Sequence, residues 1–361
     1  MRIDANDLIE ALDAVSLIPS RAGIAQSEFV KIVQAKGTVK FFLASEIFGM
    51  TEVKGDKAEA PWVHYADRAS LMPFVRAAKD LGRLSPFEFV SSKNGVLTVR
   101  QGRRKADFAK IDPINGYVEK VTVDSKPLKL TSEQKSFLTL ASKYASTDPT
   151  ISHLNCIYMS KGRALLASND VAVAMVADPV LPVSVAIPSQ LIAALGSEYS
   201  QTLSANQSIS YLKMSCGWLA QTPNEKTKNF PKVVIAGAFE DAKKYKLRVV
   251  FSGHKLMEAL KRLETYISMV VKRDFIVTVS GAQGERRIQL VCKAPQGTFQ
   301  ESVTAIKPVS KDFSCDWLMS HLLPLAELKS IGRIAVKFDD SKTSPYYFSA
   351  DNVRVLLPKR G

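Results

Sequence analysis

The sequence predicts an α+β fold built from three repeated units, each with two helices packed on antiparallel sheets. Three observations lead to this prediction. A strand-then-helix junction occurs three times, hairpin patterns follow each junction, and another helix with strands precedes each one. Leu71, Leu191 and Leu318 hold the same place in the three junctions, 120 and 127 residues apart. The repeating unit is therefore about 120 residues long.

The junctions cover residues 62–82, 183–199 and 311–328. In each, a short strand-like stretch leads to a serine, and a helical pattern of apolar residues follows. Serine side chains accept hydrogen bonds from the free N–H groups that begin a helix. We therefore expect the three helices to be capped by Ser70, Ser189 and Ser314.

Hairpin patterns follow at 86–111, 201–222 and 332–358, and Asn94-Gly95 predicts a tight turn in the first of them. The helices that precede the junctions begin near residues 5, 131 and 252. Their expected caps are Asp7, Ser132 and Ser252.

Polar, charged stretches separate the patterned segments near residues 118–130 and 237–246. They place the unit boundaries so that the three units span 1–121, 122–241 and 242–361.

The composition is that of a globular protein, with 46% hydrophobic and 23% charged residues, but the net charge is +14. A protein this basic usually meets a polyanion, and nucleic acid is the first candidate. An anionic membrane surface is the second, although the sequence has no strongly basic amphipathic helix with a Trp/Phe face. Charge that serves only solubility is a third explanation.

The four cysteines have no CxxC pair and fit neither a zinc site nor a small disulfide framework, so we expect reduced, mostly buried thiols and no metal. The longest apolar run, 171–177, is too short to cross a bilayer. The first 15 residues lack the apolar core of a secretory signal, so we expect the protein in the cytoplasm.

Four short motifs follow one another in order. Residues 153–179 read HLNCIYMSKGRALLASNDVAVAMVADP, 187–195 read IPSQLIAAL, 228–234 read KNFPKVV and 352–361 read NVRVLLPKRG. Together with the unit length, they resemble the bacterial-type sliding clamp, the beta subunit of replicative DNA polymerase. They are similar to that family's LNG…L…ATDGHRLA, VP, FPDY and YVVMPMR motifs. The resemblance covers essentially the whole chain and is strongest in the middle unit.

The resemblance implies three clamp units per chain, each with two helices inside a ring and sheets outside. Two chains would join head to tail as a homodimer around double-stranded DNA. Such a ring catalyses nothing and needs no cofactor; it tethers the replicative DNA polymerase, and a clamp loader is a further expected partner. Departures in the pocket motifs and the high charge suggest a divergent or phage-encoded member, acting at a bacterial nucleoid or in an infected host cell.

A sliding protein needs positive charge without base readout, because phosphate contacts are independent of sequence. Arg76, Lys79 and Arg83 are spaced three and four apart, so one helix face presents them together. Arg21 matches a basic loop residue of the family that touches DNA. The full expected DNA-binding set is Arg21, Arg76, Lys79, Arg83, Lys135, Lys143, Lys255, Lys261, Arg262 and Lys329.

The resemblance also implies a partner-peptide pocket between the second and third units. Carried over by motif, it would use Leu154, Ser168, Asp170, Val171, Ala172, Val173, Pro231, Leu357, Pro358 and Lys359. The family's Gly-His-Arg-Leu becomes Asp-Val-Ala-Val here, which changes the shape and charge of the pocket. The protomer interface would use Phe108, Tyr266 and Ile267.

The sequence has no Walker loop, GxGxxG, GxSxG or HExxH motif, and its four histidines lack ligand spacing. Two alternatives to the ring clamp remain. One is a basic, non-encircling processivity factor or general DNA-binding protein, which the net charge favours. The other is an enzyme with an unrecognised site.

Overall fold

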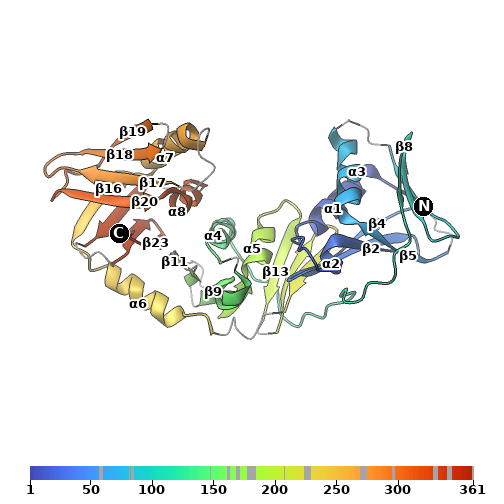
Figure 1. Cartoon of the computed structure of the whole chain (residues 1–361). Coiled ribbons are helices and arrows are strands. Elements are labelled where there is room, and N and C mark those ends of the chain that lie inside the picture. The colour runs from blue at the N-terminus through green and yellow to red at the C-terminus, as the bar shows by residue number, and fades with distance from the viewer. Residues whose placement is uncertain are drawn as a thin grey trace. The chain divides into compact units, whose positions relative to one another are not determined.

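The structure of the chain is a computed structural model. The structure describes residues 1–56, 60–80, 82, 85–146, 148–160, 163–167, 171–176, 184–206, 208–222, 229–268, 275–294, 297–327, 332–339 and 344–359. It divides into two compact units (Figure 1). Unit 1 comprises Met1–Lys129 and Gln190–Pro223, and unit 2 comprises Leu130–Ser189 and Asn224–Gly361.

Unit 1 contains two antiparallel sheets. The four-stranded sheet has the order β1-β6-β7-β8, with strands at Arg2–Ile3, Phe87–Ser91, Leu97–Gln101 and Arg104–Phe108. The seven-stranded sheet has the order β13-β14-β15-β4-β3-β2-β5. Its strands span Ser200–Ala205, Ser210–Met214, Gly217–Gln221, Phe48–Lys54, Thr38–Ala44, Phe29–Ala35 and Trp62–Asp67.

The helices of unit 1 are α1 (Ala5–Val15), α2 (Ala25–Glu28) and α3 (Arg68–Asp80). Helix α5 (Ser189–Leu195) also belongs to unit 1, except for its first residue, which is the last residue of a unit 2 segment. Helix α1 packs on β3 and β4 and beside α3 (Figure 1). It forms because apolar residues recur at helical spacing, and Leu8, Leu12 and Val15 are almost fully buried.

Unit 2 also has two antiparallel sheets. The eight-stranded sheet has the order β12-β9-β10-β11-β23-β22-β21-β16, with strands at Val185–Pro188, Cys156–Ser160, Arg163–Ala167, Ala172–Val176, Val353–Leu357, Tyr346–Ala350, Arg333–Phe338 and Leu247–Ser252. The four-stranded sheet has the order β19-β18-β17-β20, with strands at Gly297–Thr304, Arg287–Ala294, Ile276–Gly281 and Phe313–Leu318.

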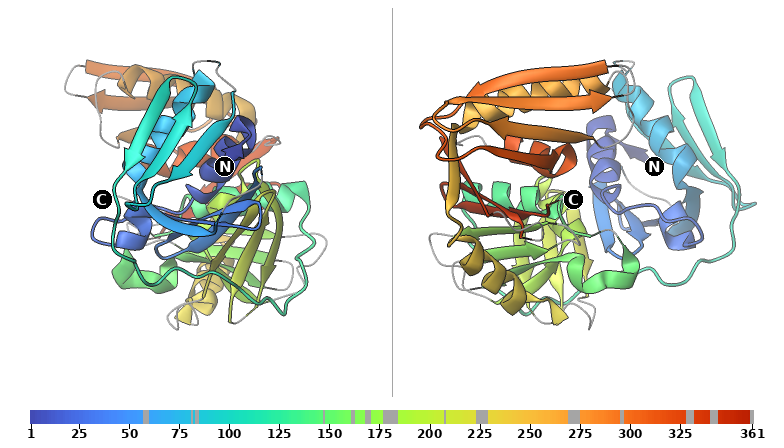
Figure 2. Two further views of the ribbon diagram at one scale, coloured as in Figure 1. Left: turned by 90° about the vertical axis from the view of Figure 1, so that its right-hand side faces the viewer. Right: turned by 60° about the vertical axis from the view of Figure 1, so that its left-hand side comes forward.

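The helices of unit 2 lie on both faces of the eight-stranded sheet. They are α4 (Ser132–Ser142), α6 (Lys232–Ala242), α7 (Gly253–Ser268) and α8 (Met319–Leu322), with 3-10 helices η1 (Pro149–Leu154) and η3 (Leu323–Glu327). Helix α7 packs against β16 and β21 and also against β19 of the other sheet (Figure 2). Helix α6 packs against β10 and β22.

The predicted hairpins form as consecutive antiparallel strand pairs in all three places. In the first, Gly95 has φ +76° and its N–H donates to the Ser92 carbonyl at 3.0 Å, as a tight turn requires. The predicted unit boundaries stay a prediction. Two sheets run across them, because β15 pairs with β4 and β11 pairs with β23.

Four of the expected helix caps are wrong. Asp4, not Asp7, caps α1, and Thr131, not Ser132, caps α4 through a reciprocal pair of bonds with Gln134. Ser70 does not cap α3. Its own N–H and hydroxyl donate to the carboxylate of Asp67, the residue that precedes the helix. Asp67 takes the capping position because β5 ends there and α3 begins at Arg68, which leaves Ser70 inside the first turn of the helix.

The fourth error is Ser314, which lies inside β20 opposite Ser280. The strand continues to Leu318, and the α-helix that follows is only four residues long. Pro324 ends it and leaves a 3-10 turn, because proline has no N–H to donate to the preceding helical turn.

Candidate functional site

The expected DNA-facing cations of helix α3 are exposed but differ in their partners. Arg76 Nε donates to Asp13 Oδ1 at 2.6 Å, and its Nη2 donates to the Ser16 hydroxyl at 2.9 Å. Lys79 is exposed and makes no ion pair with a described residue. Arg83 lies outside the described residues. Part of the charge on this helix is therefore neutralised by α1.

Arg21 lies in residues 16–27, called here the Arg21 loop, which comprises the loop after α1 and the first three residues of α2. Its guanidinium forms an ion pair with Glu46 at 2.6 Å, with about a third of each side chain exposed. Its main chain is held by the buried Ser27 hydroxyl, which accepts from Arg21 N at 2.8 Å and donates to Arg21 O at 3.0 Å. The loop thus has a defined conformation.

The remaining expected cations lie in unit 2. On α7, Lys255 and Lys261 are exposed, and Arg262 forms an ion pair with Glu301 at 3.0 Å. On α4, Lys135 is half-buried; Lys143 is exposed at the helix end. Lys329 lies outside the described residues. The described helices of both units therefore present lysines to solvent.

Arg68, the first residue of α3, is not among the residues expected from the sequence. Its Nη2 donates to Ser16 O at 2.9 Å and its Nη1 donates to Ser27 O at 3.2 Å, so it joins the two ends of the Arg21 loop. Burial, and then repulsion by Arg76, lower the pKa of its guanidinium. No spacing rule marks this residue in the sequence, because its partners lie 41 and 52 positions away.

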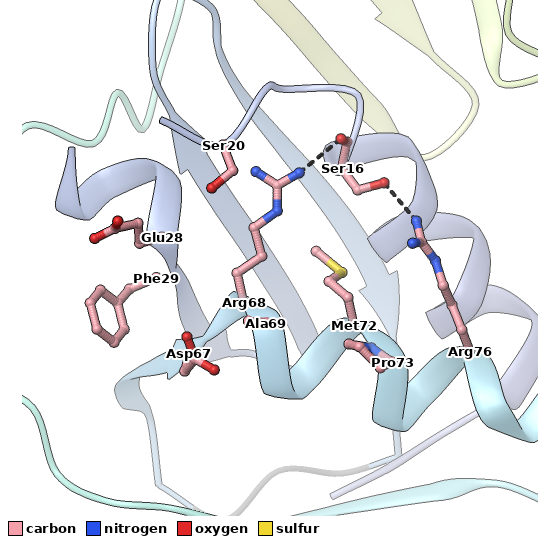
Figure 3. Close-up of a pocket in the computed structure, with 10 residues that line it drawn as sticks. All are labelled: Ser16, Ser20, Glu28, Phe29, Asp67, Arg68, Ala69, Met72, Pro73 and Arg76. Carbon is pink, nitrogen blue, oxygen red and sulfur yellow. Dashed lines mark hydrogen bonds between the residues drawn. The ribbon is translucent and has the colours of Figure 1, made fainter. Parts of the chain in front are cut away.

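Arg68 and Arg76 line an open pocket of about 630 Å³ in unit 1 (Figure 3). Apolar atoms of Phe29, Met72 and neighbouring residues form part of its wall. The complete lining is Ser16, Ser20, Glu28, Phe29, Asp67, Arg68, Ala69, Met72, Pro73 and Arg76.

The expected partner-pocket residues do not share one face of the eight-stranded sheet. Side chains alternate along a strand, so neighbours point to opposite faces. Leu154, Ala172 and Leu356 pack in or against a buried cluster under α6. Val173 and Leu357 are buried and lie one residue out of phase with Ala172 and Leu356, so they face the other side.

The other residues of the expected pocket are dispersed. Val171 is buried, and Pro231 and Pro358 are half-buried. Lys359 is 12% exposed, lies 5.5 Å from the centre of the Tyr346 ring, and forms an ion pair with Asp339 at 3.5 Å. Ser168 and Asp170 lie outside the described residues.

Helix α6 supplies side chains that the sequence analysis did not assign to this face. Phe239 lies in the cluster beside Tyr347, with ring centres 6.4 Å apart. At the N-terminal end of α6, Tyr158 stacks on Phe230 at 5.6 Å, and Lys232 Nζ donates to the Tyr158 hydroxyl at 2.9 Å. Two features of the sequence could have identified this face: the alternation of side chains along β11 and the apolar face of α6.

The expected interface residues lie at the free edges of the two four-stranded sheets or beside them. Phe108 ends β8, an edge strand of unit 1, and is buried. In unit 2, Ile267 is fully buried in α7, whereas Tyr266 is 49% exposed and stacks on Phe299 of the edge strand β19 at 6.3 Å. Ile267 therefore serves the core of its own unit.

All four cysteines are free thiols, and three of them are buried. Among the described residues, no group of three or more His, Cys, Asp or Glu side chains is placed to hold a metal ion. None of the helices in the described part of the chain is long and apolar enough to cross a membrane.

Comparison with family models and with curated protein sequences found no match. Solved structures match over the whole chain. The sliding clamp of Bartonella birtlesii, DNA polymerase III subunit beta bound to griselimycin, is 16% identical with a TM-score of 0.76, covering 100% of this chain and 99% of its own.

Two further clamps match similarly. The DNA polymerase sliding clamp of Caulobacter crescentus is 15% identical with a TM-score of 0.73, covering 100% of this chain and 99% of its own. The Helicobacter pylori beta clamp bound to a DNA ligase peptide is 11% identical with a TM-score of 0.73, and both chains are covered completely. The predicted α+β fold class is confirmed: over its entire length, this chain has the fold of the bacterial DNA polymerase III beta sliding clamps.

Proposed function

We propose that the protein is a DNA sliding clamp, a processivity factor that encircles duplex DNA as a ring of two chains and tethers replication proteins. The observation that carries this proposal is the coverage of the fold match, because the clamp fold accounts for all of this chain and nearly all of its neighbours. A clamp works by topology, so the chain itself catalyses no reaction.

The distribution of charge supports contact with DNA. Lys79, Lys255 and Lys261 project from three separate turns of helix into solvent and lack ion-pair partners among the described residues. Separate lysines can exchange phosphate contacts one at a time, which permits movement along the duplex without base recognition. We include Lys135, Lys143, Arg21 and Arg76 in the proposed DNA-facing set.

We infer that partner proteins bind unit 2 near the N-terminal end of α6. There Phe230 lies in the buried cluster, Tyr158 packs against it and Lys232 bonds to Tyr158, and Val233 and Val234 are 77% and 72% exposed. Apolar anchors with a few polar groups suit a peptide ligand. The Helicobacter pylori clamp is described with a ligase peptide bound. The partners proposed for this chain are the replicative polymerase and a clamp loader.

The ring is tested by retention on DNA of different topology. Protein is assembled on a nicked circular plasmid at low salt, and the complex is then washed at about 1 M NaCl, where surface charge is screened within a few ångström. We expect retention on the circle and release when the same plasmid is linearised. Sedimentation should show a species of two 39.7-kDa chains.

A second candidate is a basic, non-encircling processivity factor that binds DNA through a positive face. The charge favours it: unit 2 has 28 Lys and Arg against 18 Asp and Glu, or +10, and unit 1 has 21 against 17, or +4. Equal release from circular and linear DNA, together with a chain that stays monomeric at micromolar concentration, would establish this alternative.

The proposed site of action is the cytoplasm, at the nucleoid of a bacterium or in an infected cell. A phage-encoded origin is tested by a pull-down against host and viral polymerases. Preference for the viral polymerase supports that origin, and ordinary affinity for the host polymerase peptide contradicts it.

A further inference from the structure

The pocket of unit 1 has two chemically different sides. In Figure 3 the guanidinium of Arg68 lies near Ser16 and Ser20 and that of Arg76 lies near Ser16, while Glu28 and Asp67 lie on the other side of the pocket. Asp67 is occupied, because it accepts bonds from both the N–H and the hydroxyl of Ser70. Glu28 accepts from the N–H of Gly23 at 3.3 Å.

Arg68 is a cation without an anionic partner among the described residues. Its two hydrogen bonds go to main-chain carbonyl groups of Ser16 and Ser27, and it forms no ion pair with any described residue. Arg76, by contrast, is neutralised by Asp13. A half-buried guanidinium that carbonyl dipoles alone stabilise still attracts an anion, because the full positive charge remains in a partly desolvated site.

Both arginines retain hydrogen-bond donors. A guanidinium has five N–H donors. Arg68 uses Nη1 and Nη2 once each, and Arg76 uses Nε and Nη2 once each. Several N–H groups on each side chain therefore make no bond to a described residue and can bind a ligand. Ser20 adds an exposed hydroxyl on the same side of the pocket. Planar forks of N–H donors match the oxygens of a phosphate group.

We propose that this pocket binds a phosphate group between Arg68 and Arg76, with Ser20 as an additional donor. The group is either a backbone phosphate of nucleic acid or free phosphate. The nucleic-acid form rests on the proposed function and deepens it, because it makes Arg68 an anchoring residue for the duplex.

The same bonds link phosphate binding to the loop that carries Arg21. Arg68 holds both ends of this loop, at Ser16 and Ser27, and Ser27 in turn fixes the main chain of Arg21. A phosphate on Arg68 therefore lies beside the Arg21 loop, because Arg68 bonds to Ser27 O and the Ser27 hydroxyl holds the main chain of Arg21. Arg68 is both a phosphate ligand and a positioning residue.

The first arm of the test measures binding of a short linear duplex as a function of salt. Each phosphate neutralised contributes about 0.9 to the slope of log affinity against log salt. We expect Arg68→Gln to lower the slope by about one phosphate contact. Lys213→Gln, which removes an exposed charge from β14 in the same unit, should leave it unchanged.

The second arm uses inorganic phosphate alone and follows the thermal unfolding temperature, with chloride at equal ionic strength as the control. A rise for the wild-type protein that is lost in Arg68→Gln supports a site that accepts free phosphate. A change in the duplex slope without that rise supports a backbone phosphate only. If Arg68→Gln does not fold, Arg76→Gln is measured in both arms, since it leaves the two loop bonds of Arg68 intact.

An unchanged duplex slope together with an unchanged phosphate response overturns the proposal. Retention on circular DNA is measured in parallel for the wild-type protein and separates the two ideas. A ring that is retained while both arms fail means that the clamp function stands without the phosphate site. Loss of retention while either arm succeeds means that the site stands without the ring.

Discussion

At the scale of single residues, the Tyr117 hydroxyl ties the segment after β8 to unit 1. It donates to Phe29 O at 2.7 Å, and its ring lies 6.0 Å from that of Tyr65. We expect Tyr117→Phe to lower the free energy of unfolding by about 0.5–1.5 kcal/mol, because the Phe29 carbonyl loses its partner. Urea unfolding measures this change.

The control for that variant is Tyr211→Phe. Tyr211 is half-buried and stacks on Trp218 at 6.2 Å, but its hydroxyl has no hydrogen bond to a described residue. Removal of the Tyr211 hydroxyl should lower the free energy of unfolding by less than removal of the Tyr117 hydroxyl does. Equal costs would mean that the bond to Phe29 O adds no net stability.

Cys216 is the one cysteine that is not buried, so it should be the thiol that reacts in the folded protein. Burial, followed by the charge of Glu10, raises its pKa to about 11. Because the thiolate is the reactive form, its rate with a disulfide reagent should rise about tenfold per pH unit from pH 8 and level off near that pKa. Stopped-flow absorbance follows the reaction.

Cys216→Ser should abolish this phase, and the other three thiols should react only after unfolding. Burial also raises the pKa of Cys156 and Cys315, each to about 12, which slows them further. Rapid modification of two or more thiols in the native protein would contradict the buried placement of these side chains.

At the scale of elements, helix α6 depends on its packing. Its sequence, KVVIAGAFEDA, contains a run of β-branched residues and a glycine, which are poor helix formers. Phe239 is 3% exposed in the cluster under the helix. We expect Phe239→Ala to cost about 3–5 kcal/mol, because it leaves a cavity beside Tyr347. Val233→Ala, on the exposed face, should stay within about 0.5 kcal/mol; denaturant unfolding compares the two.

Two glycines predict effects of opposite sign. A side chain at Gly237 of α6 would meet nothing within 4 Å, so Gly237→Ala should stabilise the protein by about 0.5–1 kcal/mol through its helix preference. A Cβ at Gly217 of β15 would lie 2.0 Å from Met50 O of β4. Gly217→Ala should therefore cost about 1–3 kcal/mol or more. Thermal unfolding gives both signs, and a neutral Gly217→Ala would contradict the close β15–β4 pairing.

At the scale of the whole molecule, the position of the positive charge should matter more than its amount. We expect the triple variant Lys79→Gln, Lys255→Gln and Lys261→Gln to bind duplex DNA with a slope against salt that is lower by up to about 0.9 per lysine. These lysines lie on helices α3 and α7. Fluorescence anisotropy measures the slope.

The matched control removes the same charge from strands. Lys54, Lys213 and Lys293 are exposed on β4, β14 and β18 and have no ion pair with a described residue. Their triple Gln variant should bind nearly as the wild type does. Equal losses in the two triple variants would show that net charge, rather than the helices, determines binding.

Local patterns made much of this predictable from the sequence. The helices near residues 5, 131 and 252 and the three hairpins form as expected, because their 3.6- and two-residue periods report burial along one element. The caps were less predictable. The choice between Asp4 and Asp7, or between Asp67 and Ser70, depends on where a strand stops, and neighbouring strands decide that.

The candidate site was predictable only in kind. Basic helix faces were visible, but the partnership of Arg76 with Asp13 and the role of Arg68 were not, since these contacts join residues 41 to 63 positions apart. For the partner surface, motif order identified β11 and β23. It could not separate Ala172 and Leu356 from Val173 and Leu357, because a one-residue step moves a side chain to the opposite face.

By itself the sequence determined the repeating order of helices and hairpins, the thiol chemistry, the basic charge and the resemblance to sliding clamps. Each of these features follows from the composition or from the short-range spacing of residues along the chain, and neither requires knowledge of contacts between distant residues. Only the tertiary structure decided that β15 continues onto β4 and β11 onto β23, that α6 covers the cluster beside Tyr347, and that two arginines of α3 share a pocket. Those outcomes depend on the path of the chain, which brings together residues that lie far apart in the sequence. No pattern of neighbouring residues predicts such contacts.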